Sequence, residues 1–524
     1  MDIRRLGLLF HTVKYLRFRQ IYYRAYYFLR TRFFKKGYQR PLTGQVQPLS
    51  WQDLFEYTDS YKKNKEFEFL NLGHAFNSGI DWNYNTYGKL WTYNLNYFDF
   101  LNQELITLEE GLQLIKDYIN TDEGLRDGKE PYPISLRGIN WIKFLSKHSI
   151  SDMEINQTLY SHYQILLHNL EYHLLGNHLL ENGFSLFFGA YYFRDEVLYK
   201  KAIQILIKEL DEQVLSDGAH FELSPMYHQI LLHRLLDCIR LSQLNPWKED
   251  TSFLKEKAVK MLSWLEAVTF SNGNIPMVND SAYGIAPTSK QLFNYGKELG
   301  LDWAKGKLGD SGYRKFNQSN YELFVDVGNI GPTYQPGHAH SDTFSFELYV
   351  DKNPIIVDTG TSTYEKNALR QQERETESHN TVKVGNQEQT EVWGGFRVAK
   401  RAKIVKLEES PNHVQASHDG YSNLGIEHTR KVISEPSRII IQDFLNKEVE
   451  ENQTAYFHFH PSVKQIEIYE NTVRLTKEDI RLTFKNSLEL KQLSYQYAIG
   501  FNKREEAKKI AVSFRKTLNT QIDL

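Results

Sequence analysis

The sequence predicts a helical domain followed by an all-β domain, and two patterns of apolar spacing support this. Between about residues 105 and 264, apolar side chains recur at helical spacing, as at Ile165, Leu166 and Leu170, with a break about every 20 to 30 residues. After about residue 315 the spacing changes to two. The first pattern indicates helical hairpins, and the second indicates an antiparallel β-sandwich.

We divide the chain of 524 residues into three parts. Residues 1–60 form a basic N-terminal arm with helices, residues 61–310 the helical domain, and residues 311–524 the β-sandwich domain. The boundary between the helical and β domains lies in the glycine-containing segment 306–312. No strict repeat is visible, which disfavours a solenoid of identical units. Strands are expected at segments 344–350, 438–442 and 455–460.

The N-terminal arm is strongly basic. Its first 40 residues contain 11 lysines and arginines and one acidic residue, Asp2, interleaved with tyrosines and phenylalanines. Such a segment could lie on an anionic bilayer as an amphipathic helix. The alternative is a helix that packs on the helical domain with its arginines in water. Basicity is confined to the arm and no binding motif accompanies it, so we expect no nucleic-acid partner.

The sequence also bears on location. The apolar stretch 6–10 is shorter than a signal-peptide core, no small-residue cleavage site follows, and no run approaches the length of a membrane span. We therefore expect a cytoplasmic protein, which residues 1–40 could hold at the inner surface of an anionic membrane. The single cysteine, Cys238, lies in an apolar helical stretch and is expected to be a buried free thiol.

Residues 337–342 (GHAHSD) contain two histidines, His338 and His340, at positions i and i+2. In an extended segment these side chains point the same way and can share one site. Asp358 ends an apolar run and His379 precedes a strand-like segment, so strand ends could bring His340, Asp358 and His379 together. Two imidazoles and one carboxylate form a zinc-type ligand set. The alternative is a group of polar residues at strand ends.

Two further motifs lie upstream, at residues 176–183 (GNHLLENG) and 218–228 (GAHFELSPMYH). Taken in order with GHAHSD and with residues 378–382 (SHNTV), they make the chain resemble the heparinase II/III superfamily of polysaccharide lyases, which also includes alginate lyases. The resemblance covers roughly residues 85 to 460. It implies an incomplete (α/α) toroid followed by an antiparallel β-sandwich, one structural zinc per chain, and β-elimination of a uronic-acid-containing polysaccharide.

β-Elimination requires that the uronate carboxylate be neutralised before the C5 proton can leave. The resemblance assigns this task to Asn177 and His178, which open a helical run where an anion is favoured. Without the resemblance, an Asn-His pair at a helix start indicates capping. Glu181, one helical turn later, is placed to orient one of the two residues.

Tyr227 follows Ser224 and Pro225, a helix-start signature that places its phenol in the first turn. The resemblance implies that Tyr227 gives a proton to the departing glycosidic oxygen and, in some members, also removes the C5 proton. To act as a base, a phenol needs nearby positive charge to lower its pKa from about 10. His338, His178 or a metal could supply that charge. Without the resemblance, Tyr227 would be read as a core aromatic.

Three further assignments follow from the resemblance. His338 is expected to assist proton transfer, and Tyr364 matches a base found in alginate-type members. Arg374 is expected to pair with the substrate carboxylate or, alternatively, to form a structural ion pair. For substrate subsites, we predict stacking on Trp91, Tyr97 or Trp141 and hydrogen bonds from Asn94 or Asn140, with structural roles as the alternative.

The leading functional prediction is a polysaccharide lyase, acting in capsule or exopolysaccharide metabolism. One alternative is a glycoside hydrolase on the same scaffold, with Glu181 and Glu222 as its general acid and base. Another is a non-catalytic glycan-binding protein of a polysaccharide-biosynthesis complex. The joint presence of Asn177, Tyr227 and His338 argues against a pure binder.

Overall fold

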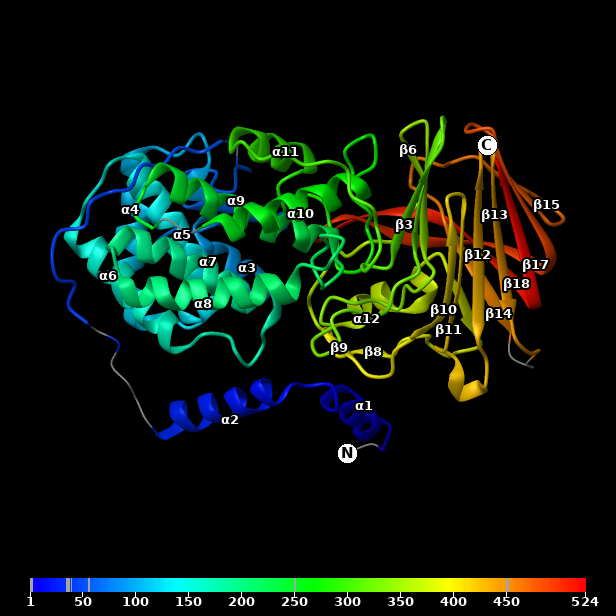
Figure 1. Ribbon diagram of the computed structural model, residues 1–524, viewed down its shortest axis with the longest axis horizontal. Coiled ribbons are helices and arrows are strands. Elements are labelled where there is room, and N and C mark those ends of the chain that lie inside the picture. The colour runs from blue at the N-terminus through cyan, green and yellow to red at the C-terminus, as the bar shows by residue number, and fades with distance from the viewer. Residues whose placement is uncertain (1–2, 34–37, 39, 55–56, 249–250, 449–451) are drawn as a thin grey trace.

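A helical domain and a β domain lie side by side in the computed structural model, with two N-terminal helices along one flank of both (Figure 1). The structure describes residues 3–33, 38, 40–54, 57–248, 251–448 and 452–524. The predicted order of a helical domain followed by a β-sandwich is confirmed. Among the described residues, no helix combines the length and apolar character needed to span a membrane.

The helical part is built around one buried helix. All residues of α7 except His178 and Phe193 are buried, as expected for a helix that is apolar on every side. It packs against α5, α6, α8 and α9. The helices are α1 (Ile3–Val13), α2 (Phe18–Phe33), α3 (Lys89–Tyr97), α4 (Leu108–Asn120), α5 (Pro131–Lys147), α6 (Met153–His168), α7 (Gly176–Phe193), α8 (Glu196–Gln213), α9 (Pro225–Leu244), α10 (Ser252–Val268), α11 (Ser289–Glu298) and, in the β domain, α12 (Ala368–Arg374).

Helix α9 starts where the sequence predicts. Ser224 is the N-cap, and its hydroxyl accepts a hydrogen bond from the Tyr227 backbone N–H at 3.2 Å. Pro225 is the first helical residue, where its missing N–H costs nothing. The phenol of Tyr227 is therefore held in the first turn of α9.

The β domain is a sandwich of two antiparallel sheets. The smaller sheet has the order β3-β4-β5-β6, and the larger has the order β10-β11-β12-β13-β18-β17-β16-β15, with β14 pairing β18 and β7. Leu323 and Leu348 of the smaller sheet join Val432, Ile441 and Phe514 of the larger sheet in one buried cluster. The predicted strand segments are confirmed.

The strands are β3 (Tyr313–Asn317), β4 (Tyr321–Asp326), β5 (Phe346–Val350), β6 (Asn353–Ile356), β7 (Val382–Val384), β8 (Val392–Trp393), β9 (Arg397–Val398), β10 (Ile404–Ser410), β11 (His413–His418), β12 (His428–Glu435), β13 (Arg438–Leu445), β14 (Gln453–His458), β15 (Ile466–Tyr469), β16 (Thr472–Leu475), β17 (Ile480–Gly500) and β18 (Lys503–Asp523). A separate hairpin, β1 (Glu66–Phe69) and β2 (Leu72–Ala75), belongs to the helical part.

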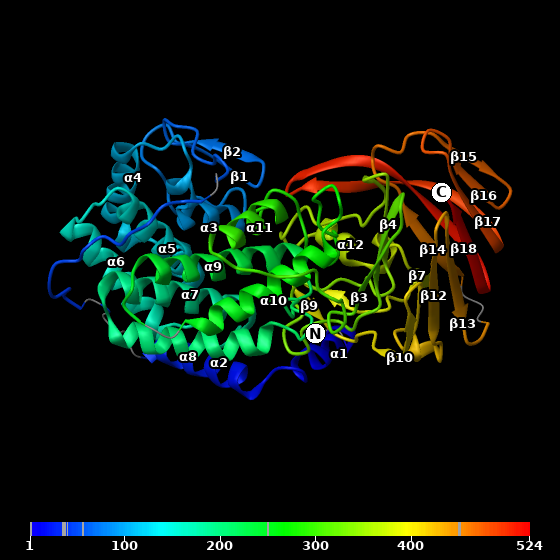
Figure 2. The same ribbon diagram turned by 45° about the horizontal axis from the view of Figure 1, so that its top comes forward.

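The long β17–β18 hairpin joins the two domains. Figure 2 shows it curving from the sandwich towards the helical domain. At its tip, the Asn502 side chain donates to the Leu70 carbonyl at 3.0 Å, and Asn71 donates to the Phe501 carbonyl at 2.9 Å. The Phe501 ring belongs to the core of the helical domain and lies 4.9 Å from the Tyr364 ring. The hairpin therefore places a β-domain loop against the helical domain.

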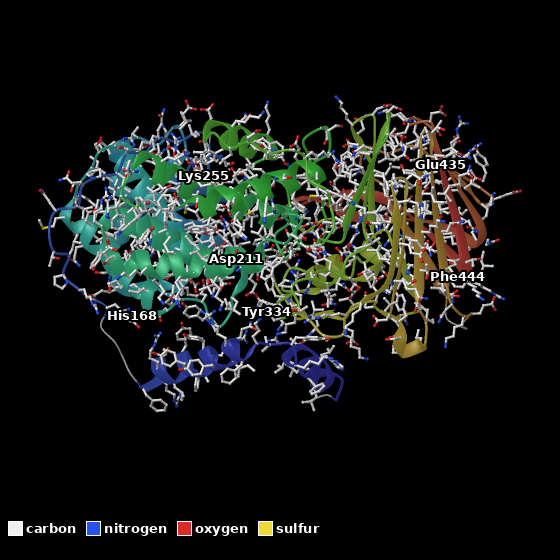
Figure 3. The ribbon with its side chains drawn as sticks, viewed as in Figure 1. His168, Asp211, Lys255, Tyr334, Glu435 and Phe444 are labelled. Atoms are coloured by element: carbon white, nitrogen blue, oxygen red, sulfur yellow. The ribbon has the colours of Figure 1, made fainter. Side chains whose placement is uncertain are left out.

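The arm forms a second bridge. The buried side chain of Gln20 donates to the Leu174 carbonyl at 3.1 Å and to Gln335 Oε1 at 3.2 Å. At the other end of the arm, the Thr12 hydroxyl donates to the Val398 carbonyl at 3.2 Å. Figure 3 shows Tyr334 and His168 on the side of the body that faces the arm. The arm thus packs on both domains, and not on the helical domain alone.

Replacing Gln20 by Ala is expected to lower the free energy of unfolding by about 1–3 kcal/mol, because two half-buried acceptors lose their buried donor. The measurement is urea denaturation of the full-length protein. Gln204→Ala is the matched control, since Gln204 is an exposed helical glutamine. Equal stability of the two variants would contradict a structural role for the Gln20 contacts.

Candidate active site

Asn177 and His178 occupy the first turn of α7, and each is held by a carboxylate. Asn177 donates to both oxygens of Glu222, from its backbone N–H at 3.0 Å and from its side chain at 2.7 Å. His178 Nδ1 lies 3.0 Å from a Glu171 oxygen. Burial favours the neutral ring of His178, but Glu171 and the nearby Glu222 outweigh it and raise its pKa. The His178 side chain remains 36% exposed, so its ring is partly accessible at this helix start.

The Glu222 carboxylate fits closely under the start of α7. Gly176 has a φ of +59°, and a Cβ at this position would lie 2.6 Å from Glu222 Oε1. Burial acts to raise the pKa of Glu222, yet His220, His338 and the hydrogen bonds from Asn177 hold it below its usual value. Glu222 is therefore an ionised anchor that fixes the direction of the Asn177 amide.

Three rings from both domains meet next to this anchor. The His338 ring lies on the Tyr227 ring with a centroid distance of 4.0 Å, and the Tyr364 hydroxyl donates to the Tyr227 hydroxyl at 3.3 Å. Burial raises the pKa of Tyr227 and of Tyr364. This corrects the expectation that nearby positive charge lowers the pKa of Tyr227, because desolvation is the larger effect here. At rest both phenols carry their protons.

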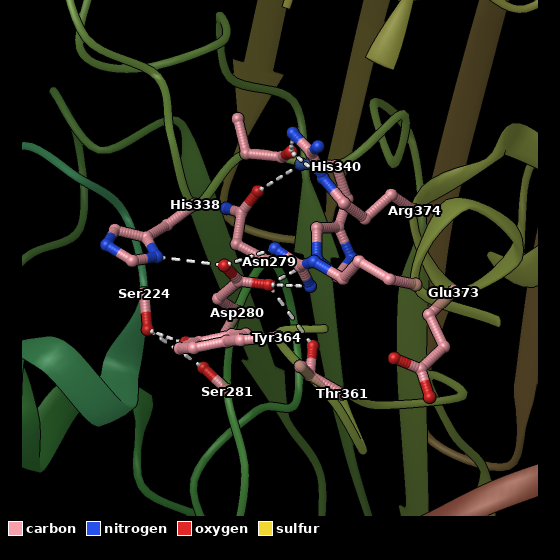
Figure 4. A network of polar contacts seen from close by, with 12 residues as sticks. Ser224, Asn279, Asp280, Ser281, His338, His340, Thr361, Tyr364, Glu373 and Arg374 are labelled. Atoms are coloured by element: carbon pink, nitrogen blue, oxygen red, sulfur yellow. Dashed lines mark hydrogen bonds and ion pairs between the residues drawn. The ribbon is translucent and has the colours of Figure 1, made fainter. Parts of the chain in front are cut away.

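Asp280 sets the orientation of His338. The Asp280 carboxylate contacts His338 Nδ1 and His340 Nε2, each at 2.8 Å (Figure 4). It also accepts from both terminal nitrogens of Arg370 at 2.5 and 2.6 Å. Burial acts to raise its pKa, but Arg370 and the two imidazoles hold it well below the usual value. An ionised carboxylate can only accept hydrogen bonds. His338 Nδ1 therefore carries a hydrogen, and Nε2 faces the Asn177 amide nitrogen at 3.4 Å.

Family models match this part of the chain on both sides of the domain junction. The model described as heparinase II/III N-terminus matches residues 134–301, and the one described as heparinase II/III-like, C-terminal, matches residues 302–524. The chain belongs to the heparinase II/III superfamily. These matches include all the residues of the ring cluster and of its anchors.

Sequence relatives agree with the family. The chain is 25% identical over 325 residues to a heparin-sulfate lyase of Bacteroides stercoris, covering 55% of this chain and 46% of the relative. A heparin-sulfate lyase of Pedobacter heparinus is 25% identical over 291 residues, covering 49% and 42%. The chain thus spans less than half the length of these relatives.

Solved structures show the same fold. A heparan sulfate lyase from Pedobacter heparinus superposes with a TM-score of 0.57 at 17% identity, covering 88% of this chain and 81% of that chain. A chondroitin AC lyase of Streptomyces coelicolor A3 gives a TM-score of 0.54 at 7% identity, covering 83% and 74%. The incomplete (α/α) toroid followed by a β-sandwich, expected from the resemblance, is the architecture of this heparinase II/III superfamily member.

The three residues expected to bind zinc in this superfamily member lie close together, but not in the arrangement of a three-ligand metal site. His379 Nδ1 lies 2.7 Å from Asp358 Oδ2, and the His340 and His379 rings are 5.3 Å apart. As they stand, no three His, Cys, Asp or Glu side chains in the described part of the chain are arranged to hold a metal. His340 Nδ1 and His379 Nε2, however, are buried without a hydrogen-bond partner. These two nitrogens are of the type that zinc prefers.

The expected stacking platforms are not accessible. Trp91 and Trp141 are fully buried in the helical core, and Trp91 Nε1 donates to the Leu72 carbonyl at 3.0 Å. Tyr97 is buried as well. Their rings face neighbouring aromatic side chains and offer no face to a sugar, so the structural alternative applies to them.

The expected polar subsite residues are also engaged within the protein. Asn140 is buried and donates to the Tyr97 carbonyl and to Asp99. Asn94 is half-buried and donates to the Leu90 carbonyl of its own helix. Arg374 is buried and donates to the carbonyls of Ala339 and Gly395. Arg374 therefore supports two loops through these carbonyl groups, and among the described residues it forms no ion pair with a carboxylate.

Glu181 does not orient the residues for which it was predicted. It is fully buried, and its carboxylate lies 3.8 Å from the Arg234 guanidinium. Burial raises its pKa to about 7. Instead, Glu222 orients Asn177 from a distant position in the sequence. Glu171 orients His178 from the loop before α7, which has no recognisable sequence pattern. Sequence reasoning also missed Asp280, although this residue comes shortly after the apolar run 275–278, as Asp358 comes after another apolar run.

Proposed function

We propose that the protein is a polysaccharide lyase that cleaves a uronic-acid-containing glycosaminoglycan by β-elimination. The observation that carries this proposal is the convergence of Asn177, Tyr227 and His338 from two domains on one partly exposed point. Membership of the heparinase II/III superfamily supports the same reaction class. The heparin-sulfate lyase relatives favour a glycosaminoglycan as substrate.

In this proposal the start of α7 binds the uronate carboxylate. The Asn177 amide, fixed by Glu222, and the His178 ring, whose pKa is raised, both favour a bound anion, as does the helix dipole. Pairing with these groups withdraws charge from the carboxylate. The neighbouring C5–H bond thereby becomes more acidic, which is the prerequisite for elimination.

Proton transfer is then divided between His338 and Tyr227. His338 Nε2 faces the site because Asp280 holds Nδ1, so it can remove the C5 proton. Tyr227 is protonated at rest because burial raises its pKa, so it can donate a proton to the departing glycosidic oxygen. Tyr364 donates to the Tyr227 hydroxyl and can help to place it.

A direct test uses purified protein with heparan sulfate, hyaluronan, chondroitin and alginate in parallel. A lyase creates a carbon–carbon double bond conjugated to the carboxylate, so ultraviolet absorbance rises as chains are cut. Absence of a rise with all four polymers would count against the proposal. New reducing ends without the absorbance would indicate hydrolysis.

The glycoside hydrolase alternative has little support from the geometry. Both oxygens of Glu222 are bound by Asn177, and its pKa lies below the usual value. Glu181 is fully buried against Arg234. Neither carboxyl is free to act on an acetal oxygen or on water. The glycan-binding alternative does not explain why two protonated phenols surround one oriented imidazole.

We further propose that a structural zinc binds at His340 and His379, with Asp358 as the third predicted ligand. The support is the pair of buried imidazole nitrogens without partners. Zinc would tie loops of the β domain together and stabilise the fold by its binding free energy. Metal analysis of purified protein is expected to find about one zinc per chain. His340→Ala should lose the metal and melt at a lower temperature than the parent.

The matched control for the metal is His413→Ala, a histidine at a partly exposed position of β11. Its metal content should equal that of the parent protein. A metal-free parent protein, or a His340→Ala variant with unchanged zinc content and melting temperature, would contradict the zinc proposal.

A further inference from the structure

The two arm helices turn their polar contacts towards the body of the protein. Arg17 forms an ion pair with Glu212 at 2.6 Å and lies over the Tyr334 ring at 3.9 Å. Arg30 donates to the His168 carbonyl at 2.6 Å, and Arg19 lies over the Tyr172 ring at 4.1 Å. Together with the buried Gln20, these contacts fix which side of α2 faces the body, and the hydrogen bond from Thr12 to the Val398 carbonyl does the same for α1.

The opposite side of the arm is apolar and exposed. We call it the outer face and define it by Phe10, Phe18, Ile21, Phe28, Leu29 and Phe33. Phe18 is 81% exposed, and the other three phenylalanines are 64–66% exposed. Large apolar side chains gathered on one surface are costly in water and mark a binding surface. A surface helix usually turns its apolar residues towards the protein and its charged residues towards water. Here arginines contact the body and phenylalanines face outward, which is the opposite arrangement.

The charge around the outer face identifies the kind of partner. Residues 3–52 contain no aspartate or glutamate. Arg5 and Arg32 are exposed on the same two helices, and Lys14 is exposed directly after α1. Basic residues beside exposed aromatic and aliphatic side chains match a membrane surface with anionic headgroups, where the rings enter the boundary layer and the cations meet phosphate. Since no described helix can span a bilayer, the contact would be peripheral.

We propose that the outer face of α1 and α2 docks the protein on an anionic lipid bilayer. A second copy of the chain is a less suitable occupant, because two such arms would bring like charges together. The docking also places the junction of the two domains near the membrane, since Gln20 contacts the loop before Asn177 and the loop before His338. This inference rests on the arm alone and does not depend on the proposed reaction.

The test is flotation of the full-length protein with vesicles of phosphatidylcholine, with and without phosphatidylglycerol. The outer-face variant replaces Phe10, Phe18, Phe28 and Phe33 by Ser. The matched control replaces Leu105, Met153 and Leu488 by Ser, three apolar residues that are 62–82% exposed elsewhere. We expect binding to the anionic vesicles at low salt, reduced about tenfold or more in the outer-face variant and less than about twofold in the control.

A second variant, with Gln in place of Arg5, Lys14 and Arg32, keeps the apolar side chains. It should lose the preference for phosphatidylglycerol, and salt should weaken the binding of the parent protein. Thermal melting shows whether each variant is folded. The proposal is overturned if the parent protein does not bind, or if both arm variants bind as the parent does. It is also overturned if neither the parent nor the outer-face variant binds vesicles, and the parent forms a dimer that the outer-face substitutions dissociate.

Discussion

Replacing Tyr227 by Phe is expected to lower turnover by about 10²–10⁴-fold while the KM changes little, because only the proton-donating oxygen is removed. The ring of the variant can still pack on His338, as the parent ring does at a centroid distance of 4.0 Å. Initial rates of absorbance increase on the polymer that the parent protein cleaves give both constants. A fall in turnover with an intact KM separates proton transfer from substrate binding.

Tyr160→Phe is the control for this experiment. It removes the same oxygen from a half-buried tyrosine whose hydroxyl donates to Asp195 at 3.2 Å, beyond the C-terminal end of α7. Its turnover should equal that of the parent. The turnover of Tyr364→Phe should lie between those of Tyr160→Phe and Tyr227→Phe. The Tyr364 hydroxyl contacts the Tyr227 hydroxyl but does not take over its role as proton donor. A parental rate for Tyr227→Phe would remove this residue from the mechanism.

Replacing Asp280 by Asn is expected to cost about 3–5 kcal/mol of stability, because it leaves the buried Arg370 without its counter-charge. Turnover of the remaining folded protein should also collapse. An Asn side chain can present its NH₂ group to His338 Nδ1, which then loses its fixed acceptor and its orientation. Urea denaturation measures the first effect, and initial rates on folded protein measure the second.

Asp443→Asn provides the matched control. Asp443 is a buried carboxylate bound to Arg430 and His428 in the sandwich, an equivalent network away from the ring cluster. It should destabilise the protein to a similar degree but leave the turnover of folded protein unchanged. Equal loss of turnover in both variants would reduce Asp280 to a general structural role.

The stability effect of both substitutions should depend on pH. Arg430 and His428 lower the pKa of Asp443 to about 2 despite its burial, and the pKa of Asp280 is also held below its usual value. A depressed folded-state pKa contributes stability above the unfolded pKa of about 4, and this contribution is lost as the pH falls towards the folded value. The variants should therefore differ from the parent less at pH 3 than at pH 7.

Local features of the chain were readable from the sequence alone. The order of the domains follows from the change in apolar spacing, and the start of α9 follows from Ser224 and Pro225. Asp358 and His379 also stand near strand ends, as the adjoining strand-like segments predict. In each case short-range periodicity or capping determines the backbone, and neighbouring residues carry the whole signal.

The partners of the site residues were decided only by the tertiary structure. Asp280 meets His338 and Arg370 across 58 and 90 residues of sequence, and Glu222 meets Asn177 across 45. No local pattern encodes such contacts, because they depend on how separate elements pack. Packing also determines desolvation, which raises the pKa of Tyr227 where sequence reasoning expected nearby charge to lower it. The sequence thus determined which residues stand at helix starts and strand ends, while burial and long-range pairing decided what each of them can do.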